Sequence, residues 1–329
     1  MIITQAPVRI SFLGGGSDFP QHFETHGGAV LTTAIDRFAY VTVQRFHYQF
    51  FDHKLRIAYR KTETPQDAAD VSHPAIRACF QRVGIDEGAE LHHMADLPAR
   101  TGLGSSSSFV VAMMQALHAY QGRFAPAETL ASEAIDLERN VLQEAGGYQD
   151  QIIAAYGGTC LIRFGRNRKF NVTQIPLPAS RILELQEHML LMYTGIERDS
   201  FQVLKQQVAR TGKNHDVLCR MARIAEEGAN WIADEGIPIT DFGELLHASW
   251  MLKRNLSDIS LPAIDDAYEA GLRAGATGGK LLGAGQGGFL LFIAKPEHHD
   301  RIQQALPGML PLKVGINAPG SRVIFAQGD

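Results

Sequence analysis

Cysteine is scarce in this sequence, and its pattern is not that of a disulfide-bonded or zinc-binding protein. Three cysteines, Cys79, Cys160 and Cys219, lie far apart among 329 residues and form no CxxC pair. An odd number of widely spaced cysteines favours neither a disulfide framework nor a zinc site. We therefore expect a protein of a reducing compartment, the cytoplasm.

Long apolar runs and an excess of basic residues are also missing. No stretch of about 18 apolar residues occurs, so we expect no membrane span. The first residues, MIITQAPVRISFLGGG, place Arg9 inside the apolar stretch with no basic region before it, unlike a signal peptide. The net charge of −4 argues against nucleic acid and anionic lipid as partners.

The length and the composition fit a globular protein of two domains. The chain has 329 residues, of which 45% are hydrophobic and 20% charged, and domains commonly have ~100–200 residues. Strand and helix patterns alternate, which predicts an α+β fold, and clear helices are expected at about 106–120 and 127–144. The polar, proline-bearing stretch 165–180 marks the junction. We therefore expect an N-terminal domain at residues 1–170 and a C-terminal domain at 171–329.

Glycine is abundant, with 32 residues, and it gathers in three segments. The most informative is PARTGLGSSSS at 98–108, which lies between a predicted strand and an apolar helix. Glycines let the backbone approach a ligand closely, and the free N–H groups in the first turn of a helix attract anions. The segment therefore predicts a phosphate site, with an ordinary serine-capped helix as the alternative. Its residues are Gly102, Leu103, Gly104, Ser105, Ser106, Ser107 and Ser108.

The second glycine segment, GGKLLGAGQGG at 278–288, contains the spacing GxGxxG at Gly283, Gly285 and Gly288. A dinucleotide-binding fingerprint opens a helix, but the strand-like FLLFIA follows here, so we reject that interpretation. No Walker A loop occurs, because neither serine nor threonine follows Lys280. A glycine loop that leads into a strand favours packing against a phosphate or another loop, with a purely structural turn as the alternative.

The third segment, PVRISFLGGGSD at 7–18, could be any tight turn when taken alone. The three segments in this order, however, resemble the three motifs of the GHMP kinase superfamily. Within it, the stretches RISFLGGGSDFP, GGYQDQIIAAYGG, YTGIERDS and GSRVIF resemble the D-glycero-D-manno-heptose 7-phosphate kinases. This resemblance implies the two-domain GHMP kinase fold, with a left-handed β-α-β crossover in the N-terminal domain and a ferredoxin-like C-terminal domain. ATP and a sugar would meet in the cleft between the domains.

The resemblance also implies ATP and Mg²⁺ as cofactors and assigns roles to single residues. Asp150 would face the acceptor hydroxyl as base or orienting group, with a helix N-cap as the alternative. Glu138 falls toward the apolar stripe of its helix, where a carboxylate needs a partner such as Mg²⁺; an exposed helix-edge glutamate is the alternative. Ser106 would be the second protein ligand of the metal. Arg9 stands where mevalonate-kinase-like members carry a lysine, so it would neutralise transition-state charge or only pair with Asp150.

For the substrate, the resemblance implies that Asp18 hydrogen-bonds sugar hydroxyls, with a turn-forming aspartate as the alternative. A substrate phosphate needs cations, and we favour Arg198 over the basic cluster at 163–169, which is typical of a solvated hairpin tip. His22 and His26, four residues apart, favour pocket lining or surface over a metal pair. The expected substrate-binding residues are Gly15, Gly16, Ser17, Asp18, Arg198, Gly283, Ala284 and Gly285.

We expect an enzyme that transfers the γ-phosphate of ATP to the anomeric hydroxyl of D-glycero-D-manno-heptose 7-phosphate, in bacterial surface-polysaccharide synthesis. An anomeric kinase for fucose, a uronic acid or an N-acetylhexosamine is the alternative within the class. A catalytically silent GHMP-fold binding protein is the alternative outside it. The sequence leaves open whether the chain forms a homo-oligomer.

Overall fold

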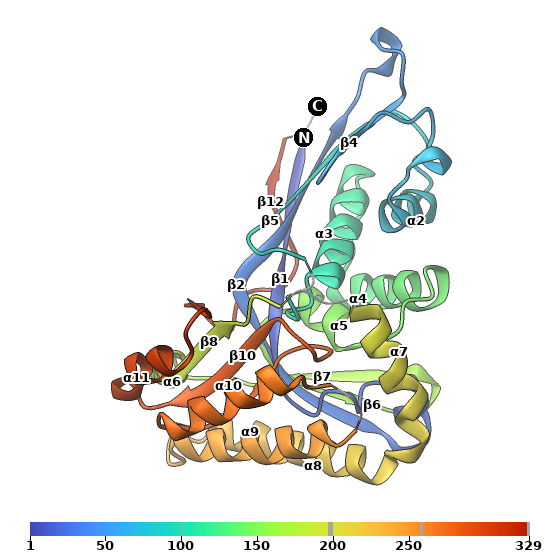
Figure 1. The fold of residues 1–329 in the computed structure, drawn as a ribbon. Helices are drawn as coiled ribbons and strands as arrows, with labels where there is room; N and C mark the ends of the chain where they lie inside the picture. The colour runs from blue at the N-terminus through green and yellow to red at the C-terminus, as the bar shows by residue number, and fades with distance from the viewer. Residues whose placement is uncertain (100, 197–199, 257–258, 328–329) are drawn as a thin grey trace.

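The computed structural model of the protein describes residues 1–99, 101–196, 200–256 and 259–327. It consists of an eight-stranded sheet, a four-stranded sheet and the helices packed on them (Figure 1). Both ends of the chain lie at the same end of the large sheet, where its first and last strands pair. This mixture of helices and sheets confirms the α+β class.

The large sheet is built around two long antiparallel strands, β1 (Ile2–Leu13) and β2 (Gly28–Arg45). The first half of β2 also pairs with β6 (Thr159–Phe164), and its second half pairs with β5 (Ala89–Ala95). The other strands extend this sheet: β3 (Leu55–Ala58), β4 (Thr62–Glu63), β7 (Phe170–Gln174) and β12 (Arg322–Ala326). Because β3 runs parallel to β5, α2 (Pro74–Val83) makes a β-α-β crossover between them.

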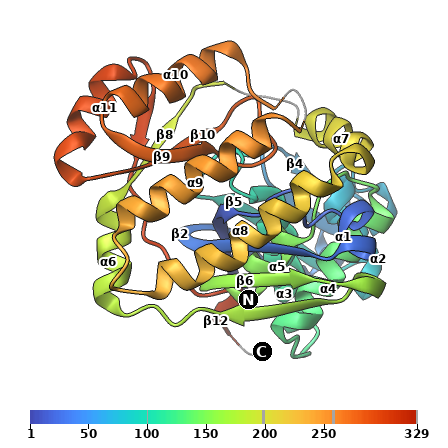
Figure 2. The same ribbon diagram turned by 90° about the horizontal axis from the view of Figure 1, so that it is seen from below.

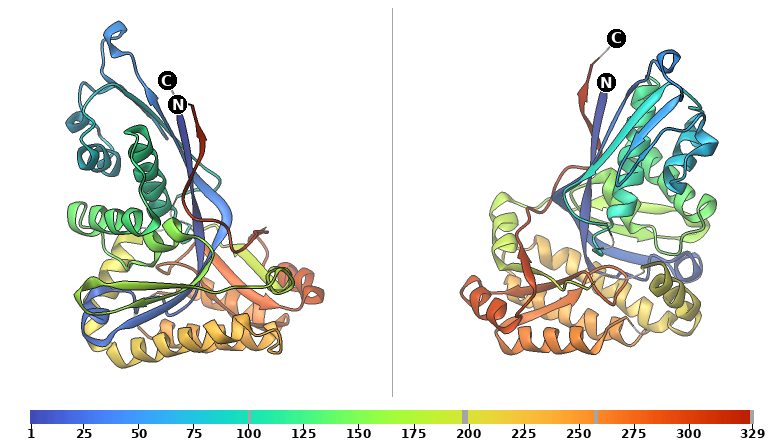
Figure 3. Two further views of the ribbon diagram at one scale, coloured as in Figure 1. Left: turned by 180° about the vertical axis from the view of Figure 1, so that it is seen from behind. Right: turned by 45° about the horizontal axis from the view of Figure 1, so that its top comes forward.

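Helices cover both faces of the large sheet around β2 (Figure 3). One face carries α3 (Ser105–Tyr120), α4 (Ala127–Asp136) and α5 (Gln149–Tyr156), and the other carries α8 (His215–Ala233) and α9 (Ile239–Arg254). Side chains alternate along a strand, so Val30 and Ala34 join the core on the first face. Leu31 and Ile35 join the core on the second. Burial on both faces explains why this stretch of β2 is almost continuously apolar.

The small sheet has the order β11-β8-β10-β9, and all neighbouring strands are antiparallel. Its elements are β8 (Met189–Tyr193), β9 (Ala276–Leu281), β10 (Phe289–Ala294) and β11 (Leu310–Leu312), with α10 (Pro262–Arg273) and α11 (His299–Ala305). By order along the chain this is 4-1-3-2, the ferredoxin-like arrangement, which confirms the fold expected of the second half. Figure 2, seen from below, shows α8 and α9 side by side in front of the sheets.

The border predicted between residues 170 and 171 falls at the first residue of β7, within a hairpin of the large sheet. β7 pairs with β6, and β12 returns from the second half of the chain to pair with β1. The two halves also share a core, since Phe12 of β1 packs edge-on against Phe242 of α9 with ring centroids 5.5 Å apart. The border falls inside a hairpin, and β12 returns to the large sheet, because strands pair between segments that are distant in the chain. Local composition does not specify such pairing.

Helix α4 is shorter than the helix predicted at 127–144. It ends at Asp136, a π-helical turn (Leu137–Val141) follows, and Gln143 then adopts a left-handed backbone conformation with φ of 53°. Between residues 200 and 233 the chain forms two separate helices, α7 (Ser200–Arg210) and α8. Within the described parts of the chain, we find no helix whose length and hydropathy would suit a membrane span.

Candidate active site

The serine-rich segment forms the N-terminal end of α3, as the sequence predicts. Gly102 and Gly104 have left-handed backbone conformations, with φ of 86° and 78°, which glycine adopts at little cost. The backbone N–H of Arg9 donates to the Leu103 carbonyl (2.9 Å), so this turn is attached to β1. Because α3 is buried along its length, its N-terminal N–H groups are held firmly at the edge of a cavity.

Three of the four serines of this turn line the cavity, and the fourth, Ser108, does not. Ser105, Ser106 and Ser107 line the cavity, and Ser106 is exposed in it. The Ser107 hydroxyl donates to Oε2 of Glu138 (3.0 Å). The Ser107 hydroxyl therefore contacts the carboxylate of Glu138, and the exposed Ser106 lines the same cavity.

Leu103 and Ser108 differ from the other residues of the predicted phosphate loop. The Leu103 side chain is fully buried in the core shared by the two halves. The Ser108 hydroxyl is buried and donates to the Pro7 carbonyl at 2.6 Å. Their side chains therefore support the loop from within, because α3 packs directly against β1.

Glu138 faces inward, as its helical position predicts, and it is only 2% exposed. Its Oε2 accepts hydrogen bonds from Ser107 and Gln151, whereas its Oε1 has no hydrogen-bond partner among the described residues. Burial raises the pKa of this carboxyl to about 7. A buried carboxylate oxygen without a donor, lining a cavity beside a phosphate loop, fits a hard cation such as Mg²⁺. The described residues include no cluster of three or more His, Cys, Asp or Glu suited to a metal.

Arg139, which follows Glu138 in the π-helical turn, lines the same cavity. Single π turns often occur at functional sites. The Arg139 guanidinium donates to the carbonyls of Gly147 (2.9 Å) and Glu144 (3.2 Å), and it lies 3.4 Å from Glu138 Oε2. Arg139 therefore holds the loop that leads from Glu138 into α5.

Asp150 lies in the first turn of α5 and forms a two-pronged ion pair with Arg9 of β1. The Arg9 Nε donates to Oδ1 at 2.9 Å and an Nη donates to Oδ2 at 2.8 Å, while the other Nη donates to the Gly102 carbonyl (2.7 Å). Arg9 is 5% and Asp150 25% exposed. A Cβ atom added at Gly104 would lie 3.2 Å from Asp150 Oδ2. The ion pair thus borders directly on the phosphate loop, and Tyr148, not Asp150, is the N-cap of α5.

Asp18 is buried in the loop between β1 and α1 (Pro20–His26). Its Oδ1 accepts the Gly16 N–H (2.9 Å), and its Oδ2 accepts the backbone and side-chain N–H groups of Gln149 at 3.3 and 3.2 Å. Burial, and to a lesser degree the nearby charge of Asp150, raise the pKa of Asp18. The Ser17 hydroxyl donates to the Gly14 carbonyl (2.8 Å), so Ser17 shapes the turn. Asp18 therefore shapes this turn and also lines a cavity.

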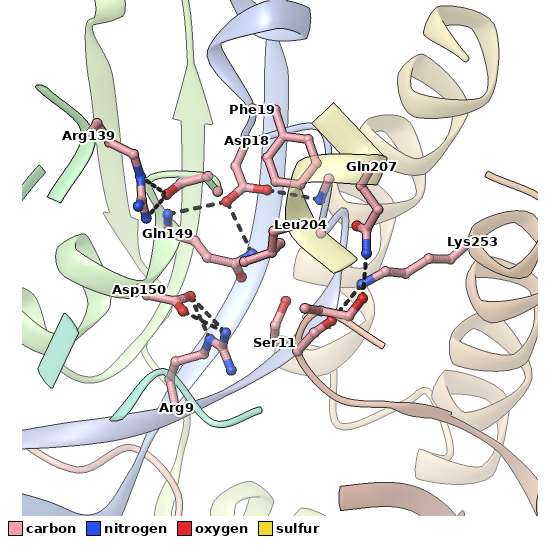
Figure 4. Close-up of a pocket in the computed structure, with 16 residues that line it drawn as sticks. Arg9, Ser11, Asp18, Phe19, Arg139, Gln149, Asp150, Leu204, Gln207 and Lys253 are labelled. Carbon is pink, nitrogen blue, oxygen red and sulfur yellow. Dashed lines mark hydrogen bonds and ion pairs between the residues drawn. The ribbon is translucent and has the colours of Figure 1, made fainter. Parts of the chain in front are cut away.

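The cavity that Asp18 lines is bordered by the glycine segments at 7–18 and 278–288 and by the start of α5 (Figure 4). Gly15 and Gly16 of the first segment and Gly283 and Ala284 of the other line it together. Gly285 is absent from this lining, because it packs against Ile259, where an added Cβ would come within 2.3 Å. Six residues border both this cavity and that of the phosphate loop: Arg9, Arg139, Asp150, Leu204, Gly283 and Ala284.

A family comparison matches this arrangement of motifs. Residues 70–158 match the GHMP kinases N terminal domain, and residues 237–312 match the GHMP kinases C terminal domain, together half of the chain. The chain belongs to the GHMP kinase family. It is accordingly a kinase, a phosphotransferase that acts on an alcohol group.

Kinases that are named for different substrates resemble this GHMP kinase along most of its length. A D-glycero-alpha-D-manno-heptose 7-phosphate kinase of Campylobacter jejuni is 27% identical over 317 residues, which cover 93% of each chain. A mevalonate kinase of Thermococcus sibiricus is 24% identical, with 98% of each chain covered. The crystal structure of a D-glycero-D-manno-heptose 1-phosphate kinase from Bacteroides thetaiotaomicron covers all of this chain with a TM-score of 0.76 at 22% identity. This likeness shows the shared two-domain fold.

Five polar residues of the cavity that Asp18 lines were missed by the sequence analysis: Ser11, Arg139, Gln149, Gln207 and Lys253. Arg139 and Gln149 neighbour the predicted residues Glu138 and Asp150, so their proximity in sequence was a usable signal. No signal in the sequence points to Lys253, because it reaches the cavity only through the packing of α9 against β9.

Among the described cations predicted for a substrate phosphate, those of the basic cluster at 163–169 do not line this cavity. Arg198, the favoured residue, lies outside the described residues. In the competing cluster, Arg163 pairs with Glu226 and Arg168 pairs with Glu24, each at 2.7 Å and exposed. Both arginines lie on the exposed β6–β7 hairpin, in keeping with a solvated hairpin tip.

Gly147 offers a test of how closely Asp18 must be placed for this kinase. A Cβ atom at Gly147 would lie 1.8 Å from Oδ2 of Asp18, so Gly147→Ala should displace the carboxylate or the loop. We expect kcat/KM for the sugar to fall by about 10²-fold, since a displacement near 1 Å can have that effect. Gly165→Ala, at a site with no atom within 4 Å of the added Cβ, is the matched control and should retain wild-type kinetics. Equal activity of both variants would contradict a role for Asp18 placement.

Three histidine rings connect α1, which follows the Asp18 loop, to the start of α8. His22 and His215 lie with their Nδ1 atoms 2.9 Å apart, and the ring of His26 stacks on His22 and contacts His215 at a tilt of 38°. His22 is fully buried, and its Nε2 has no partner among the described residues. His22 and His26 therefore pack in the contact between α1 and α8, and neither lines the cavity of Asp18 or that of the phosphate loop.

This contact predicts acid sensitivity. Burial and the charges of His215 and His26 lower the pKa of His22 from 6.5 to about 4. Between these values the unfolded chain binds more protons than the folded one, so the free energy of unfolding should fall as the pH drops from about 6.5 to 4. The loss should approach ~3 kcal/mol. His22→Asn should flatten this slope in urea titrations across that range, whereas His47→Asn, at an exposed site, should not. An unchanged slope in His22→Asn would contradict the assignment.

Proposed function

We propose that this kinase transfers the γ-phosphate of ATP to the anomeric hydroxyl of D-glycero-D-manno-heptose 7-phosphate, forming the 1,7-bisphosphate. The product would serve bacterial surface-polysaccharide synthesis. One observation carries the proposal: the Arg9–Asp150 ion pair borders both the cavity of the phosphate loop and the cavity of Asp18. The heptose 7-phosphate kinase among the relatives supports the choice of sugar.

In this proposal the N-terminal end of α3 binds the phosphates of ATP. Its backbone N–H groups and the positive end of the helix dipole attract the phosphate oxygens, and the hydroxyls of Ser105 and Ser106 line the same cavity. Glu138, through its Oε1, and Ser106 would hold Mg²⁺, which neutralises phosphate charge when bound. ATP is a cytoplasmic substrate and Cys79 and Cys160 are buried free thiols, so we place the protein in the cytoplasm.

Asp150 would orient the acceptor hydroxyl and accept its proton. The anomeric hydroxyl is the most acidic hydroxyl of a sugar, so a carboxylate activates it sufficiently. Arg9 holds Asp150 by two hydrogen bonds at the phosphate loop. Its guanidinium is therefore positioned to stabilise the charge on the transferred phosphoryl group. Arg9 can therefore pair with Asp150 and also neutralise charge in the transition state, the two roles that the sequence analysis considered.

A panel of acceptors tests the proposal. The protein, ATP and Mg²⁺ would be incubated with heptose 7-phosphate, free heptose, fucose, a uronic acid and an N-acetylhexosamine, and the products read by ³¹P NMR. We expect the highest kcat/KM with heptose 7-phosphate and a new phosphorus resonance coupled to the anomeric proton. Strong turnover of an unphosphorylated sugar alone would remove the heptose phosphate assignment. No turnover of any acceptor would favour a silent binding protein.

A further inference from the structure

Glu144 places a second carboxylate in the cavity of the phosphate loop, together with that of Glu138. The two residues are six positions apart in the sequence, but the Glu144 N–H donates to the Glu138 carbonyl at 2.8 Å. The chain turns back between them through the π-helical turn and through Gln143, whose φ is 53°. The backbone therefore holds Glu144 next to Glu138.

Both carboxyl groups are withdrawn from bulk water. Glu138 is 2% exposed, and Glu144 is partly buried. Burial raises the pKa of Glu144, and the charge of Arg139 opposes this shift. Burial, and to a lesser degree the nearby charge of Glu144, also raise the pKa of Glu138. The two carboxylates are thus close enough to repel each other, and a cation beside them would relieve this repulsion.

The cation that the chain itself supplies, Arg139, leaves one oxygen of this pair without a partner. Its guanidinium lies 3.4 Å from Oε2 of Glu138, and it donates to the carbonyls of Glu144 and Gly147. Oε1 of Glu138 has no hydrogen-bond partner among the described residues. A buried carboxylate oxygen without a donor is costly. Because Glu138 lines the cavity, this oxygen points to a ligand that the chain does not contain.

The charges of the cavity wall favour a cation as that ligand. Among the described residues, the wall carries three carboxylates and two guanidinium groups, those of Glu138, Glu144, Asp150, Arg9 and Arg139. Arg9 is engaged by Asp150 through two hydrogen bonds, so Arg139 faces the other two carboxylates. The phosphates of ATP would bring more negative charge into the same cavity. A divalent cation between the carboxylates and the phosphates removes this repulsion.

The structural alternative is that Glu144 only anchors the loop between Glu138 and α5. Its backbone already does so, because its N–H donates to Glu138 and its carbonyl accepts from Arg139. Mg²⁺ is usually held by one or two carboxylates together with substrate phosphates and waters, not by a cage of protein ligands. Two carboxylates and a serine hydroxyl fit that pattern. They also agree with the lack, within the described parts of the chain, of a larger metal-binding cluster.

We propose that Glu144 is a further ligand of the metal site, and that Glu138 and Glu144 together bind a divalent cation before ATP arrives. The inference rests on the proposed function, in which Glu138 and Ser106 hold the Mg²⁺ that accompanies ATP. It adds that the nucleotide-free protein binds the cation by itself, since the affinity of a site for a hard cation depends on the number of its charged ligands. Without Glu144, the metal would have to arrive with the nucleotide.

Mn²⁺ prefers the same oxygen ligands as Mg²⁺, and its electron paramagnetic resonance measures binding to the nucleotide-free protein. We expect the wild type to bind Mn²⁺, and the dissociation constant to rise by about 10- to 100-fold in Glu144→Gln, the usual effect of removing a group that supports a metal site. Glu138→Gln should lose at least as much affinity, and Glu144→Asp, which keeps the charge, should retain part of it. Glu128→Gln, at an exposed site in the first turn of α4, is the matched control and should bind as the wild type does.

Melting temperatures give a second readout. Mn²⁺ should raise the melting temperature of the wild type and raise that of Glu144→Gln much less, since a ligand that binds only the folded chain stabilises it. A metal-free Glu144→Gln that melts below the Glu128→Gln control would show a structural role for the carboxylate and overturn the inference. Equal Mn²⁺ affinity in these two variants would also overturn it, as would a nucleotide-free wild type that binds no Mn²⁺.

The failure of this inference and that of the proposed function are distinguishable. None of the contradicting results above affects the acceptor panel, so the proposed transfer to a sugar is judged separately by its products. If Mn²⁺ binds and is lost in Glu144→Gln, but no acceptor is phosphorylated, the proposed function fails and the metal site at Glu138 and Glu144 stands.

Discussion

Replacing Asp150 with alanine is expected to lower kcat by about 10²- to 10⁴-fold, the range of general acid–base contributions, while ATP affinity stays nearly unchanged. The carboxylate borders the phosphate loop, yet among the described residues its hydrogen bonds come from Arg9 and not from the loop. ATP should therefore still bind the N-terminal end of α3. Steady-state kinetics with the preferred sugar and calorimetric ATP binding measure the two quantities.

The companion variant Asp150→Asn separates catalysis from folding. Asp150→Ala leaves the guanidinium of Arg9, which is 5% exposed, without its carboxylate, and we expect it to lower the free energy of unfolding by about 1–3 kcal/mol. The asparagine keeps an oxygen acceptor for Arg9 and should be more stable, yet equally slow. Wild-type turnover in either variant would show that the base lies elsewhere.

Replacing Glu138 with glutamine should have the second largest effect. We expect turnover at fixed Mg²⁺ to fall by roughly 10²-fold, because charge stabilisation by a bound metal is worth several kcal/mol, and the Mg²⁺ concentration for half-maximal rate to rise. The metal-free variant should, in contrast, melt at a higher temperature than the wild type at pH 8. Burial raises the pKa of Glu138 to about 7, so above that pH the wild type holds an unfavourable buried charge that glutamine lacks.

Glu133→Gln is the matched control for this experiment. Glu133 lies on α4, five residues before Glu138, and its carboxylate is bonded to His118 at 2.7 Å rather than lining the cavity. We expect its Mg²⁺ dependence to equal that of the wild type. If Glu138→Gln shows the same Mg²⁺ dependence as this control, or a lower melting temperature, Glu138 is a structural residue and the metal site is misplaced.

Local sequence could predict those parts of the site that are themselves local. The glycines and serines of the phosphate loop predict the N-terminus of a helix, and the helical pattern around Glu138 predicts that its side chain faces inward. The π-helical turn after Asp136, which contains Glu138 and Arg139, could not be predicted from the sequence. The partition of the serines, with Ser108 turned to Pro7, likewise depends on how α3 packs on β1.

The features that the sequence could not predict depend on contacts between distant segments. Lys253 meets Gly15 and Gly283 only because α9 packs against the small sheet and the two glycine loops adjoin. The domain border differs for the same reason, since β7 and β12 are recruited to the large sheet by pairing with β6 and β1. Composition marks a junction near these residues, but hydrogen-bond pairing decides to which sheet they belong.

The central claim, that one cleft brings ATP and the acceptor hydroxyl together at Asp150, is tested most directly by a crystal structure with a non-hydrolysable ATP analogue, Mg²⁺ and heptose 7-phosphate. The account predicts phosphates on the N–H groups at the start of α3, Mg²⁺ on Glu138, and the anomeric hydroxyl hydrogen-bonded to Asp150. A nucleotide bound away from the Gly102–Ser107 turn, or an acceptor without contact to Asp150, would contradict it.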